Sequence, residues 1–373
     1  MLQAFTGADV FDGTMLHRRA VLVVQDGRVV AIQGKVPAGA TEVRLPGGTL
    51  SPGLLDLQVN GGGGVMVDSS IDAAALAALC ALHGRLGATG ILPTLITDTP
   101  EATARVIAAG MAASGVPGFL GLHLEGPHLD PARKGAHDAG LIRPMTGDDL
   151  NQLCRAAREL PALMVTVAPA SVTLDQIAKL AAAGVIVSLG HTDATLEQAK
   201  AAIAAGARCA THLFNAMSQM GNREPGMVGA VLTSSIAAGV IADGHHVAVE
   251  ALRVAVAARP NGLFLVSDCM AAAGSEATEF TLGGRRILRR DGCLRLEDGT
   301  LAGADLTLPQ AVRVMVQRVG LPLEAALRMA TTTPATLLSR PDLGRLTPGL
   351  PATMIHLDPD LTLTQVWRSG RPV

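Results

Sequence analysis

The sequence predicts an α/β protein: a (β/α)8 TIM-type barrel with a small β-sandwich domain formed by the N- and C-terminal segments. Across the middle of the 373-residue chain, eight short apolar runs alternate with alanine-rich segments of helical period. Such alternation is typical of parallel β/α repeats, and eight of them suggest a closed barrel. Both ends of the chain carry short β-like runs broken by glycine turns. We expect residues 1–51 and 344–373 to form the β domain and residues 52–343 the barrel.

The N-terminal segment is expected to be β structure. In AVLVVQDGRVVAIQG (20–34), Asp26-Gly27 is a favourable hairpin turn between two apolar runs. The C-terminal GLPATMIHLDPDLTLTQVWRSGRPV (349–373) has the same character. If the two ends pair in one domain, the middle of the chain remains one continuous unit.

The barrel strands are expected at the eight apolar runs. In order these are GLLDLQVNG (53–61), TGILPTLIT (89–97), FLGLHLEG (119–126), MVTVAP (164–169), VIVSLG (185–190), RCATHLF (208–214), GVIADG (239–244) and LFLVSD (263–268). Segments such as IDAAALAALCALHGRLG (71–87) and TLEQAKAAIAAGA (195–207) have helical spacing and supply the crossovers.

Composition excludes several classes of function. A net charge of -2, with a pI near 6.5, leaves no basic surface for nucleic acid or an anionic membrane. Aromatic residues make up 2% of the chain, which argues against base stacking. The five cysteines are scattered without a CxxC pair, so neither a disulfide framework nor a cysteine zinc site is expected. Without a signal-like start or a membrane-length apolar run, we expect a cytoplasmic protein.

Polar or ionisable residues stand at the ends of six of the eight runs. They are Gln58 and Asn60, Glu125, His191, His212, Asp243 with His246 nearby, and Asp268. The carboxyl ends of barrel strands converge at one mouth, where enzymes of this fold carry out their chemistry. Residues far apart in the sequence are therefore expected to become neighbours.

Glu125, His191 and His212 match a known ligand set for a catalytic metal ion. One carboxylate and two imidazoles hold zinc in many hydrolases and leave a position for water. A single histidine at a strand end is more often a loop hydrogen-bonding group, but three independent strand ends with compatible ligands favour one shared divalent ion. Zinc is the first choice, and iron or cobalt would accept the same ligands.

Asp268 ends the eighth run and is the candidate acid/base. An unligated carboxylate beside the ion can take a proton from the attacking water and return it to a leaving amine. The alternative role is an N-cap for the segment that follows, although Cys269-Met270-Ala271 lacks the usual capping-box glutamate.

An ordered set of motifs resembles the N-acetylglucosamine-6-phosphate deacetylase family of the amidohydrolase superfamily. The motifs are GLHLEGPHLD (121–130), KGAHD (134–138), SLGHTDAT (188–195), THLFNAM (211–217), REPG (223–226), ADGHHV (242–247), LVSDCMAAAG (265–274) and LAGADLTL (301–308). The likeness extends from SPGLLDLQVNGGGG (51–64) to LTPGLPA (346–352). It implies release of acetate from a phosphorylated N-acetylamino sugar by a metal-activated water.

The resemblance also implies roles for individual residues. Glu125, His191 and His212 would hold the metal, Asp268 would act as acid/base, and His137 would polarise the acetamide carbonyl. The residues implied to bind substrate are Ala136, Asn215, Ala216, Arg223, His246, Leu301, Ala302 and Gly303. The resemblance further implies a homodimer in which Arg223 reaches the neighbouring active site.

Several alternatives remain open at this point. REPG could be a surface turn with Arg223 paired to Glu224. His245 competes with His246 for the phosphate. The substrate could be N-acetylgalactosamine 6-phosphate instead of the gluco epimer. A non-catalytic, sugar-binding scaffold of the same fold is a third reading, although the ligands and Asp268 are all in place.

Two further features concern the surroundings of the metal. Many amidohydrolases have an HxH pair where this chain has Gln58 and Asn60, and neutral amides are poor ligands for a transition metal, so one ion is expected. The glycines of NGGGG (60–64) are expected to allow close backbone approach, with a plain flexible turn as the alternative. His123 is expected on the same barrel face as Glu125 in a supporting position, and His128 has no assigned role.

Overall fold

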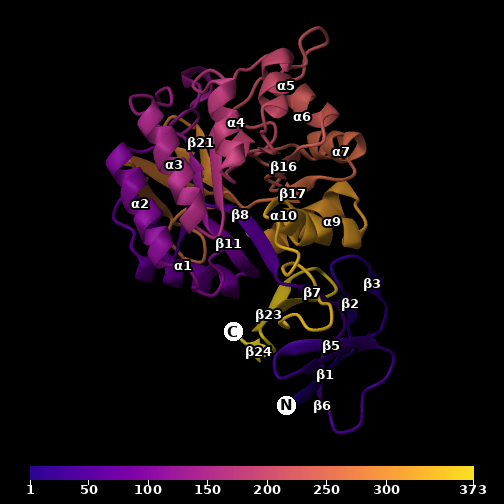
Figure 1. Ribbon diagram of the computed structural model, residues 1–373. Helices are drawn as coiled ribbons and strands as arrows, with labels where there is room; N and C mark the ends of the chain where they lie inside the picture. Colours follow the sequence, from indigo (N-terminus) through magenta and orange to yellow (C-terminus); the bar gives the residue numbers. More distant parts are fainter.

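The computed structural model describes residues 1–373 and contains a barrel of eight parallel strands (Figure 1). The strands are arranged around the barrel in the same order as along the chain, as successive β/α units require. The strands are β8 (Leu54–Val59), β11 (Ala88–Ile96), β12 (Leu122–Glu125), β13 (Leu163–Val167), β14 (Ile186–Leu189), β15 (Cys209–Ala210), β16 (Ala237–Val240) and β17 (Leu263–Leu265). Each overlaps one of the eight apolar runs, so the predicted barrel is confirmed.

The barrel closes between the residues that follow β17 and the end of β8. Val59 and Cys269 form a parallel bridge, and the Asn60 amide donates to the Cys269 carbonyl at 2.9 Å. The Asp268 amide donates to the Gln58 carbonyl at 3.0 Å. This closure brings the ends of the first and eighth strands together, so Gln58, Asn60 and Asp268 become neighbours.

Helices cover the outside of the barrel (Figure 1). They are α1 (Ala73–Arg85), α2 (Pro100–Ala112), α3 (Gly147–Glu159), α4 (Leu174–Ala182), α5 (Leu196–Ala204), α6 (Gly226–Thr233), α7 (Val249–Ala258), α8 (Leu308–Val314), α9 (Leu323–Ala330) and α10 (Thr332–Leu337). A core of 80 buried residues fills the barrel region and extends to Phe11, Ile355 and Leu357 of the terminal strands; it is mainly aliphatic because the chain has few aromatic residues. None of these helices combines the length and apolar character needed to cross a bilayer.

The two ends of the chain meet in two small sheets below the barrel, as expected (Figure 1). One sheet has the order β5-β4-β1-β6, and the other joins both termini in the order β24-β23-β22-β7-β2-β3. The strands are β1 (Leu2–Thr6), β2 (Asp9–Phe11), β3 (Leu16–His17), β4 (Val21–Gln25), β5 (Arg28–Gln33), β6 (Thr41–Arg44), β7 (Thr49–Pro52), β22 (Met354–Leu357), β23 (Leu363–Arg368) and β24 (Arg371–Pro372). The rings of Phe5 and Trp367 pack edge to face between the two ends.

An antiparallel meander inserted after β17 was not expected from the sequence. Its strands are β18 (Glu279–Leu282), β19 (Arg285–Arg290), β20 (Cys293–Leu296) and β21 (Leu301–Ala304). Leu282, Ile287 and Leu294 are buried in a small separate core with Met270. Because Met270 follows the end of the eighth barrel strand, this core fixes the meander over the carboxyl end of the barrel.

The glycine-rich segment forms a short hairpin of β9 (Gly61–Gly62) and β10 (Val65–Met66). A Cβ atom on Gly61 would lie 2.3 Å from the Val65 carbonyl oxygen and 3.0 Å from the Ala271 amide nitrogen. Only glycine fits such an approach. Gly61 therefore packs closely against other backbone, while the expected approach of these glycines to the metal pocket or substrate stays a prediction, because none of them lines the active-site cavity.

The start of α3 allows a first prediction about stability. The Thr146 hydroxyl accepts from the Asp149 amide, Asp149 accepts from the Thr146 amide at 2.8 Å, and Arg143 donates to both Asp149 oxygens at 2.6 and 2.7 Å. Burial opposes ionisation, but these bonds hold the pKa of Asp149 well below its usual range. Asp149→Asn should lower the free energy of unfolding by about 1–2 kcal/mol at pH 7.

The sign of the pH dependence follows from the lowered pKa. The contribution of Asp149 is present above about pH 4 and is lost as pH falls toward the folded-state pKa. Urea unfolding of Asp149→Asn at several pH values measures it. The matched control is Asp148→Asn, since Asp148 is exposed in the same turn. Equal effects of the two substitutions at pH 7 would contradict the prediction.

Candidate active site

Three predicted metal ligands converge at the carboxyl end of the barrel. Glu125 ends β12, while His191 and His212 follow β14 and β15. Glu125 Oε1 lies 3.0 Å from His212 Nε2 and 3.4 Å from His191 Nε2, and the two Nε2 atoms are 3.1 Å apart. Two ligand atoms bound at about 2.05 Å to one tetrahedral ion lie roughly 3.3 Å apart. The three donors therefore have the mutual spacing that a single divalent cation requires.

The ring of His191 presents an unprotonated nitrogen to this centre. Its Nδ1 lies 2.9 Å from the Arg133 carbonyl, which can only accept, so Nδ1 carries the proton of the neutral ring. The lone pair of Nε2 then points toward Glu125 and His212. Metal-binding histidines usually have such a partner on the other nitrogen. His191 thus has the tautomer of a metal ligand.

The ionisation of Glu125 and His212 is also consistent with a bound cation. Burial opposes ionisation of Glu125, but the imidazoles of His191 and His212 beside it outweigh burial and hold its pKa well below the usual range. Burial likewise opposes protonation of His212, but Glu125 outweighs it and raises the pKa of His212. An ionised carboxylate inside a protein requires a positive partner. A divalent ion would meet this requirement and compete with the His212 proton.

Asp268 lies beside the cluster and is held by two side-chain amides. Asn60 Nδ2 donates to Asp268 Oδ1 at 2.7 Å, and Gln58 Nε2 donates to the same oxygen at 3.1 Å. Gln58 Nε2 also lies 3.1 Å from Glu125 Oε1. Burial, followed by the charge of Glu125, raises the pKa of Asp268 to about 6. One oxygen is fixed, and Oδ2, which has no protein partner, remains for proton transfer.

His137 faces Glu125 from the loop after β12. Thr97 donates its backbone N–H to His137 Nδ1 at 3.3 Å, and the Thr97 hydroxyl lies 2.7 Å from the same nitrogen. With Nδ1 as acceptor, the proton of the neutral ring is on Nε2, which lies 3.8 Å from Glu125 Oε2. Burial holds the pKa of His137 well below its usual range. The neutral ring can therefore donate a hydrogen bond toward the centre of the site.

The backbone is strained at this end of the barrel. His191, His212, Ala216 and Asp268 have φ values of 45°, 29°, 49° and 51°. Non-glycine residues rarely adopt positive φ, and such residues cluster at functional sites where the surrounding structure imposes them. Here the strain aims the side chains of successive strand ends at one point.

A cavity of about 560 Å³ opens next to these groups. This volume suits a small-molecule ligand. Of the substrate-binding residues expected from the sequence, the structure places six along its wall: Ala136, Asn215, Ala216, His246, Leu301 and Gly303. Ala302 lies between two of them but points into the meander core. Arg223 does not line the cavity; it is exposed on the loop before α6, and no ion pair joins it to Glu224.

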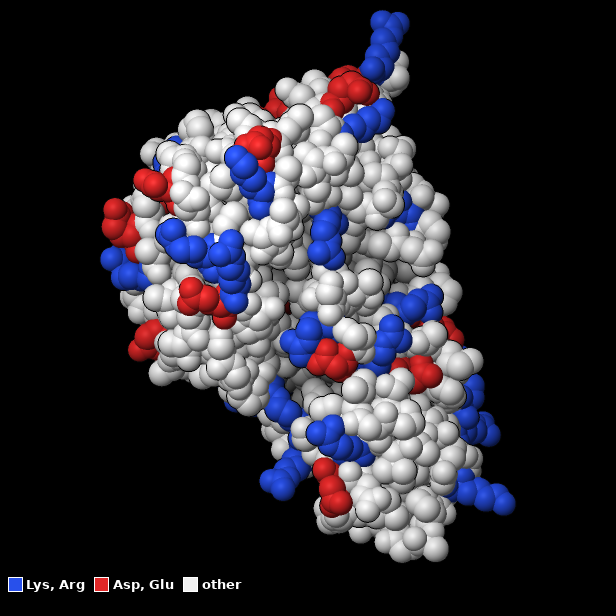
Figure 2. Space-filling view, viewed as in Figure 1, with Lys and Arg blue, Asp and Glu red and all other residues white.

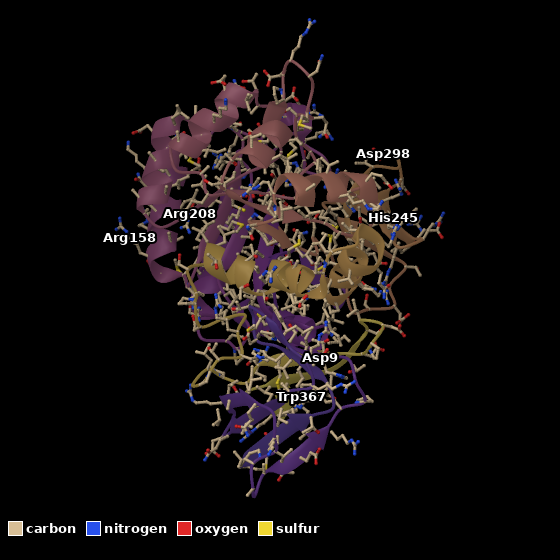
Figure 3. All side chains as sticks on the ribbon, turned by 90° about the vertical axis from the view of Figure 1, so that its right-hand side faces the viewer. Asp9, Arg158, Arg208, His245, Asp298 and Trp367 are labelled. Carbon is tan, nitrogen blue, oxygen red and sulfur yellow. The ribbon has the colours of Figure 1, made fainter.

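The structure distinguishes the two adjacent histidines. His246 lines the cavity, its side chain is 6% exposed, and its Nδ1 lies 2.6 Å from Asp243 Oδ2. His245 lies at the surface and takes no part in the cavity wall (Figure 3). His246 is therefore the residue of the pair that can contact a bound molecule.

The two other histidines near Glu125, His123 and His128, make hydrogen bonds that support the fold. His123 is buried inside the barrel, with Nε2 2.7 Å from Thr166 Oγ1 and Nδ1 3.2 Å from the Leu57 carbonyl. Burial lowers the pKa of His123 to about 4, so it stays neutral. It supports three strands beneath the ligands. His128 binds the Arg143 carbonyl at 3.1 Å and so holds the loop that follows Glu125.

Two supporting features were missed in the sequence. Asp56 is buried on β8 and accepts the Ser267 amide at 3.1 Å, so it holds the turn that presents Asp268. Burial raises the pKa of Asp56 to about 7. Arg295 of the meander stands at the cavity mouth. An acidic residue within the apolar run GLLDLQVNG was the available signal for Asp56, whereas nothing in the sequence pointed to Arg295.

Comparison with known proteins agrees with this geometry. Residues 49–373 match the Amidohydrolase family. The N-acetylgalactosamine-6-phosphate deacetylase of Shewanella sp. (strain ANA-3) is 39% identical, over 98% of this chain and 94% of the relative. The N-acetylglucosamine-6-phosphate deacetylase structure from Pasteurella multocida superposes with a TM-score of 0.95 at 34% identity, covering 100% of both chains.

A third relative was solved with a sugar phosphate. It is an aspartate-to-alanine mutant of the N-acetyl-D-glucosamine-6-phosphate deacetylase from Mycobacterium smegmatis, in complex with N-acetyl-D-glucosamine-6-phosphate. Its TM-score is 0.92 at 35% identity, covering 100% of this chain and 98% of that one. Identity at this level over essentially complete chains establishes common ancestry as well as fold. The chain therefore belongs to the amidohydrolase family and, within it, to the group formed by these deacetylases.

Proposed function

We propose that this protein hydrolyses N-acetyl-D-glucosamine 6-phosphate to D-glucosamine 6-phosphate and acetate. The observation that carries the proposal is the position of Asp268. Its carboxylate lies beside the Glu125–His191–His212 cluster, with one oxygen fixed by amides and the other free at a cavity of about 560 Å³. A metal cluster with an adjacent proton acceptor is the arrangement needed to hydrolyse an amide.

The side chains divide the reaction between them. A divalent cation held by Glu125, His191 and His212 would supply Lewis acidity and lower the pKa of water. Asp268 takes a proton from the attacking water at Oδ2 and delivers it to the departing nitrogen. His137 donates from Nε2 to the carbonyl oxygen as negative charge develops there. Asn215, Ala216 and His246 lie along the rest of the wall, where the sugar and its phosphate would extend.

N-acetylgalactosamine 6-phosphate is the second candidate substrate. The relative from Shewanella, at 39% identity, is named for the galacto epimer, whereas the Pasteurella and Mycobacterium structures are named for the gluco epimer. Both substrates carry the same acetamide and phosphate and differ at one hydroxyl. The cluster and Asp268 serve either substrate equally, so the choice depends on the sugar-facing wall formed by residues such as Leu301 and Gly303.

An acetate-release assay tests the function and the choice of sugar together. Metal-loaded protein is given N-acetylglucosamine 6-phosphate, N-acetylgalactosamine 6-phosphate and unphosphorylated N-acetylglucosamine. We expect acetate from the phosphosugars, with kcat/KM lower by about 10²-fold or more without the phosphate. A strong preference for the galacto epimer would overturn the gluco assignment. If none of the three sugars releases acetate, the proposal is wrong, and a protein that also takes up no metal during loading is a binding scaffold.

We further propose that the metal is zinc and that the protein is cytoplasmic. Zinc suits a site with one carboxylate and two imidazoles, and metal analysis of protein purified without added metal tests this choice against iron and cobalt. All five cysteines are free, and four of them are buried. Free thiols suit a reducing compartment, which supports a cytoplasmic location.

Asn60 allows a prediction about the amides that hold Asp268. Asn60→Leu keeps the side-chain size but removes the 2.7 Å bond to Asp268 Oδ1. We expect kcat to fall by about 10- to 100-fold, because a hydrogen bond to a charged group is lost, with little change in KM or metal content. Gln58→Leu is the informative comparison: Gln58 also donates to Glu125, so this variant should lose metal affinity as well. Unchanged kcat in Asn60→Leu would contradict this role.

Arg223 is proposed to serve the active site of a second subunit. It is exposed and absent from the wall of its own cavity, which supports a role in a homodimer. Arg223→Ala and Asp268→Asn subunits, each inactive alone, are mixed under conditions of subunit exchange. Half of the dimers would then contain one intact site, so about a quarter of the wild-type activity should return. If Arg223 acts within its own subunit, no activity returns.

A further inference from the structure

We propose that the opposite end of the barrel carries a second binding site, for a small phosphate ester. A cavity of about 920 Å³ lies there, larger than the active-site cavity of about 560 Å³. Arg208, Ser235 and Gly262 line it, and each precedes a barrel strand, whereas the metal ligands follow the strands. Helices α9 and α10 form its other wall. The new cavity and the active site are therefore on opposite faces of the barrel.

All the charged side chains that line this cavity are positive. Arg208, Arg259, Arg328 and Arg345 line it, and no aspartate or glutamate does. None of the four arginines belongs to an ion pair anywhere in the protein, although the chain has 32 acidic and 30 basic residues. In the view of Figure 2, which shows the side with α9 and α10, several basic side chains lie around a central hollow, with acidic side chains at its lower edge. Such a surface attracts an anion.

The guanidinium groups keep donors free for a ligand. Arg259 is buried, and its Nη1 donates to the carbonyls of Val231 and Ile236 at 3.0 and 2.6 Å, while Nε and Nη2 have no partner. The other three arginines each use one nitrogen, in bonds of 3.2 Å to Leu337 or Thr14. A guanidinium has five N–H donors, so most of the donors in this set remain available.

A purely structural role explains only part of this arrangement. Arginines that bind carbonyls at helix ends stabilise the fold, and the amino-terminal face of a barrel commonly serves stability. That role uses one nitrogen of each side chain. It does not explain why four arginines line one cavity that contains no carboxylate. Burial of Arg259 without an opposite charge also lowers its pKa, the direction expected for a cation in an unfavourable environment. A bound anion would remove this unfavourable condition.

The chemistry of the wall identifies the class of ligand. Arginine forks match the oxygens of a phosphate group, and Thr333 adds a hydroxyl. Ile203, Leu321 and Met329 supply apolar contacts beside the arginines. The volume exceeds the needs of inorganic phosphate and lies in the range of sites for larger small molecules. A phosphate monoester that carries a ring system, up to the size of a nucleotide, fits both parts of the wall.

Calorimetric titration of the metal-loaded protein with AMP tests the site, with inorganic phosphate and adenosine as separate probes. The Arg208→Gln/Arg345→Gln double variant should weaken AMP binding at least about tenfold and leave kcat and KM for the acetylated sugar phosphate unchanged. Arg259 is avoided because its two bonds hold the end of α6 and the segment before β16. The matched control is Arg158→Gln/Arg253→Gln, which removes the same charge outside the cavity; Arg253 also binds only carbonyls.

Each outcome decides the matter. AMP binding that exceeds that of adenosine and is lost in the cavity variant, but not in the control variant, supports the proposal. It is overturned if AMP does not bind at millimolar concentration, or if the two variants weaken binding equally. A change of oligomeric state in the cavity variant, measured by light scattering, would also overturn it, because the face would then be a subunit contact. None of these results depends on the identity of the deacetylated sugar.

Discussion

Asp268→Asn is expected to reduce kcat by about 10²- to 10⁴-fold while the protein keeps its metal. The substitution preserves size, and Oδ1 can still accept from the Asn60 and Gln58 amides. What is lost is the basic oxygen that takes a proton from water and returns it to the leaving nitrogen. Metal content per subunit, measured by mass spectrometry, should equal that of the wild type, because Asp268 lies outside the three-ligand cluster.

The pH profile provides a second readout for Asp268. Burial and the charge of Glu125 raise its pKa to about 6, and a cation nearby would favour the ionised form and lower it. Because ionised Asp268 is the active form, kcat/KM should rise with pH, with its acid limb at or below pH 6. That limb should be missing from the residual activity of Asp268→Asn. Near-normal kcat in this variant would show that another group moves the proton.

The sequence was sufficient to predict that Glu125, His191 and His212 lie together, because ionisable residues stand at the ends of the apolar runs. In an apolar run such as FLGLHLEG, the end of the strand is marked by the ionisable residue just before the final glycine, and a parallel barrel brings all such ends to one face. Glu125, His191 and His212 could therefore be placed together without coordinates. The same logic located Asp268. The structure adds their spacing and the tautomer of His191, which depend on backbone that only the folded chain defines.

Features that depend on register could not be predicted. Gln58 and Asn60 were recognised as neutral replacements for ligands, but their bonds to Asp268 join residues about 210 positions apart across the closure of the barrel. The β18–β21 meander was missed because its strands contain many charges and only one buried face, so they lack the continuous apolar character of barrel strands. The Gly283-Gly284 and Asp291-Gly292 turns were its available signals.

Glu125→Gln is expected to abolish metal binding and, with it, activity. Glu125 is the only anionic ligand in the cluster, and an amide is a poor replacement for a carboxylate. Loss of a supporting group around a metal typically weakens affinity or activity 10- to 100-fold, so loss of the charged ligand should exceed about 10²-fold in affinity. Equilibrium dialysis with zinc measures this directly, and kcat at a fixed, low zinc concentration should fall below detection.

A stability measurement separates metal loss from misfolding in this variant. A metal that binds only the folded state raises its stability, by about 2.7 kcal/mol at 100 times Kd. Adding zinc to chelator-treated protein should therefore raise Tm in the wild type and in Asp268→Asn, but not in Glu125→Gln. Without zinc, Glu125→Gln should remain folded, because the amide removes a buried charge along with its interactions with His191 and His212. If Glu125→Gln still binds zinc tightly, the carboxylate is not a ligand, and the shared-ion arrangement on which the proposed hydrolysis depends is wrong.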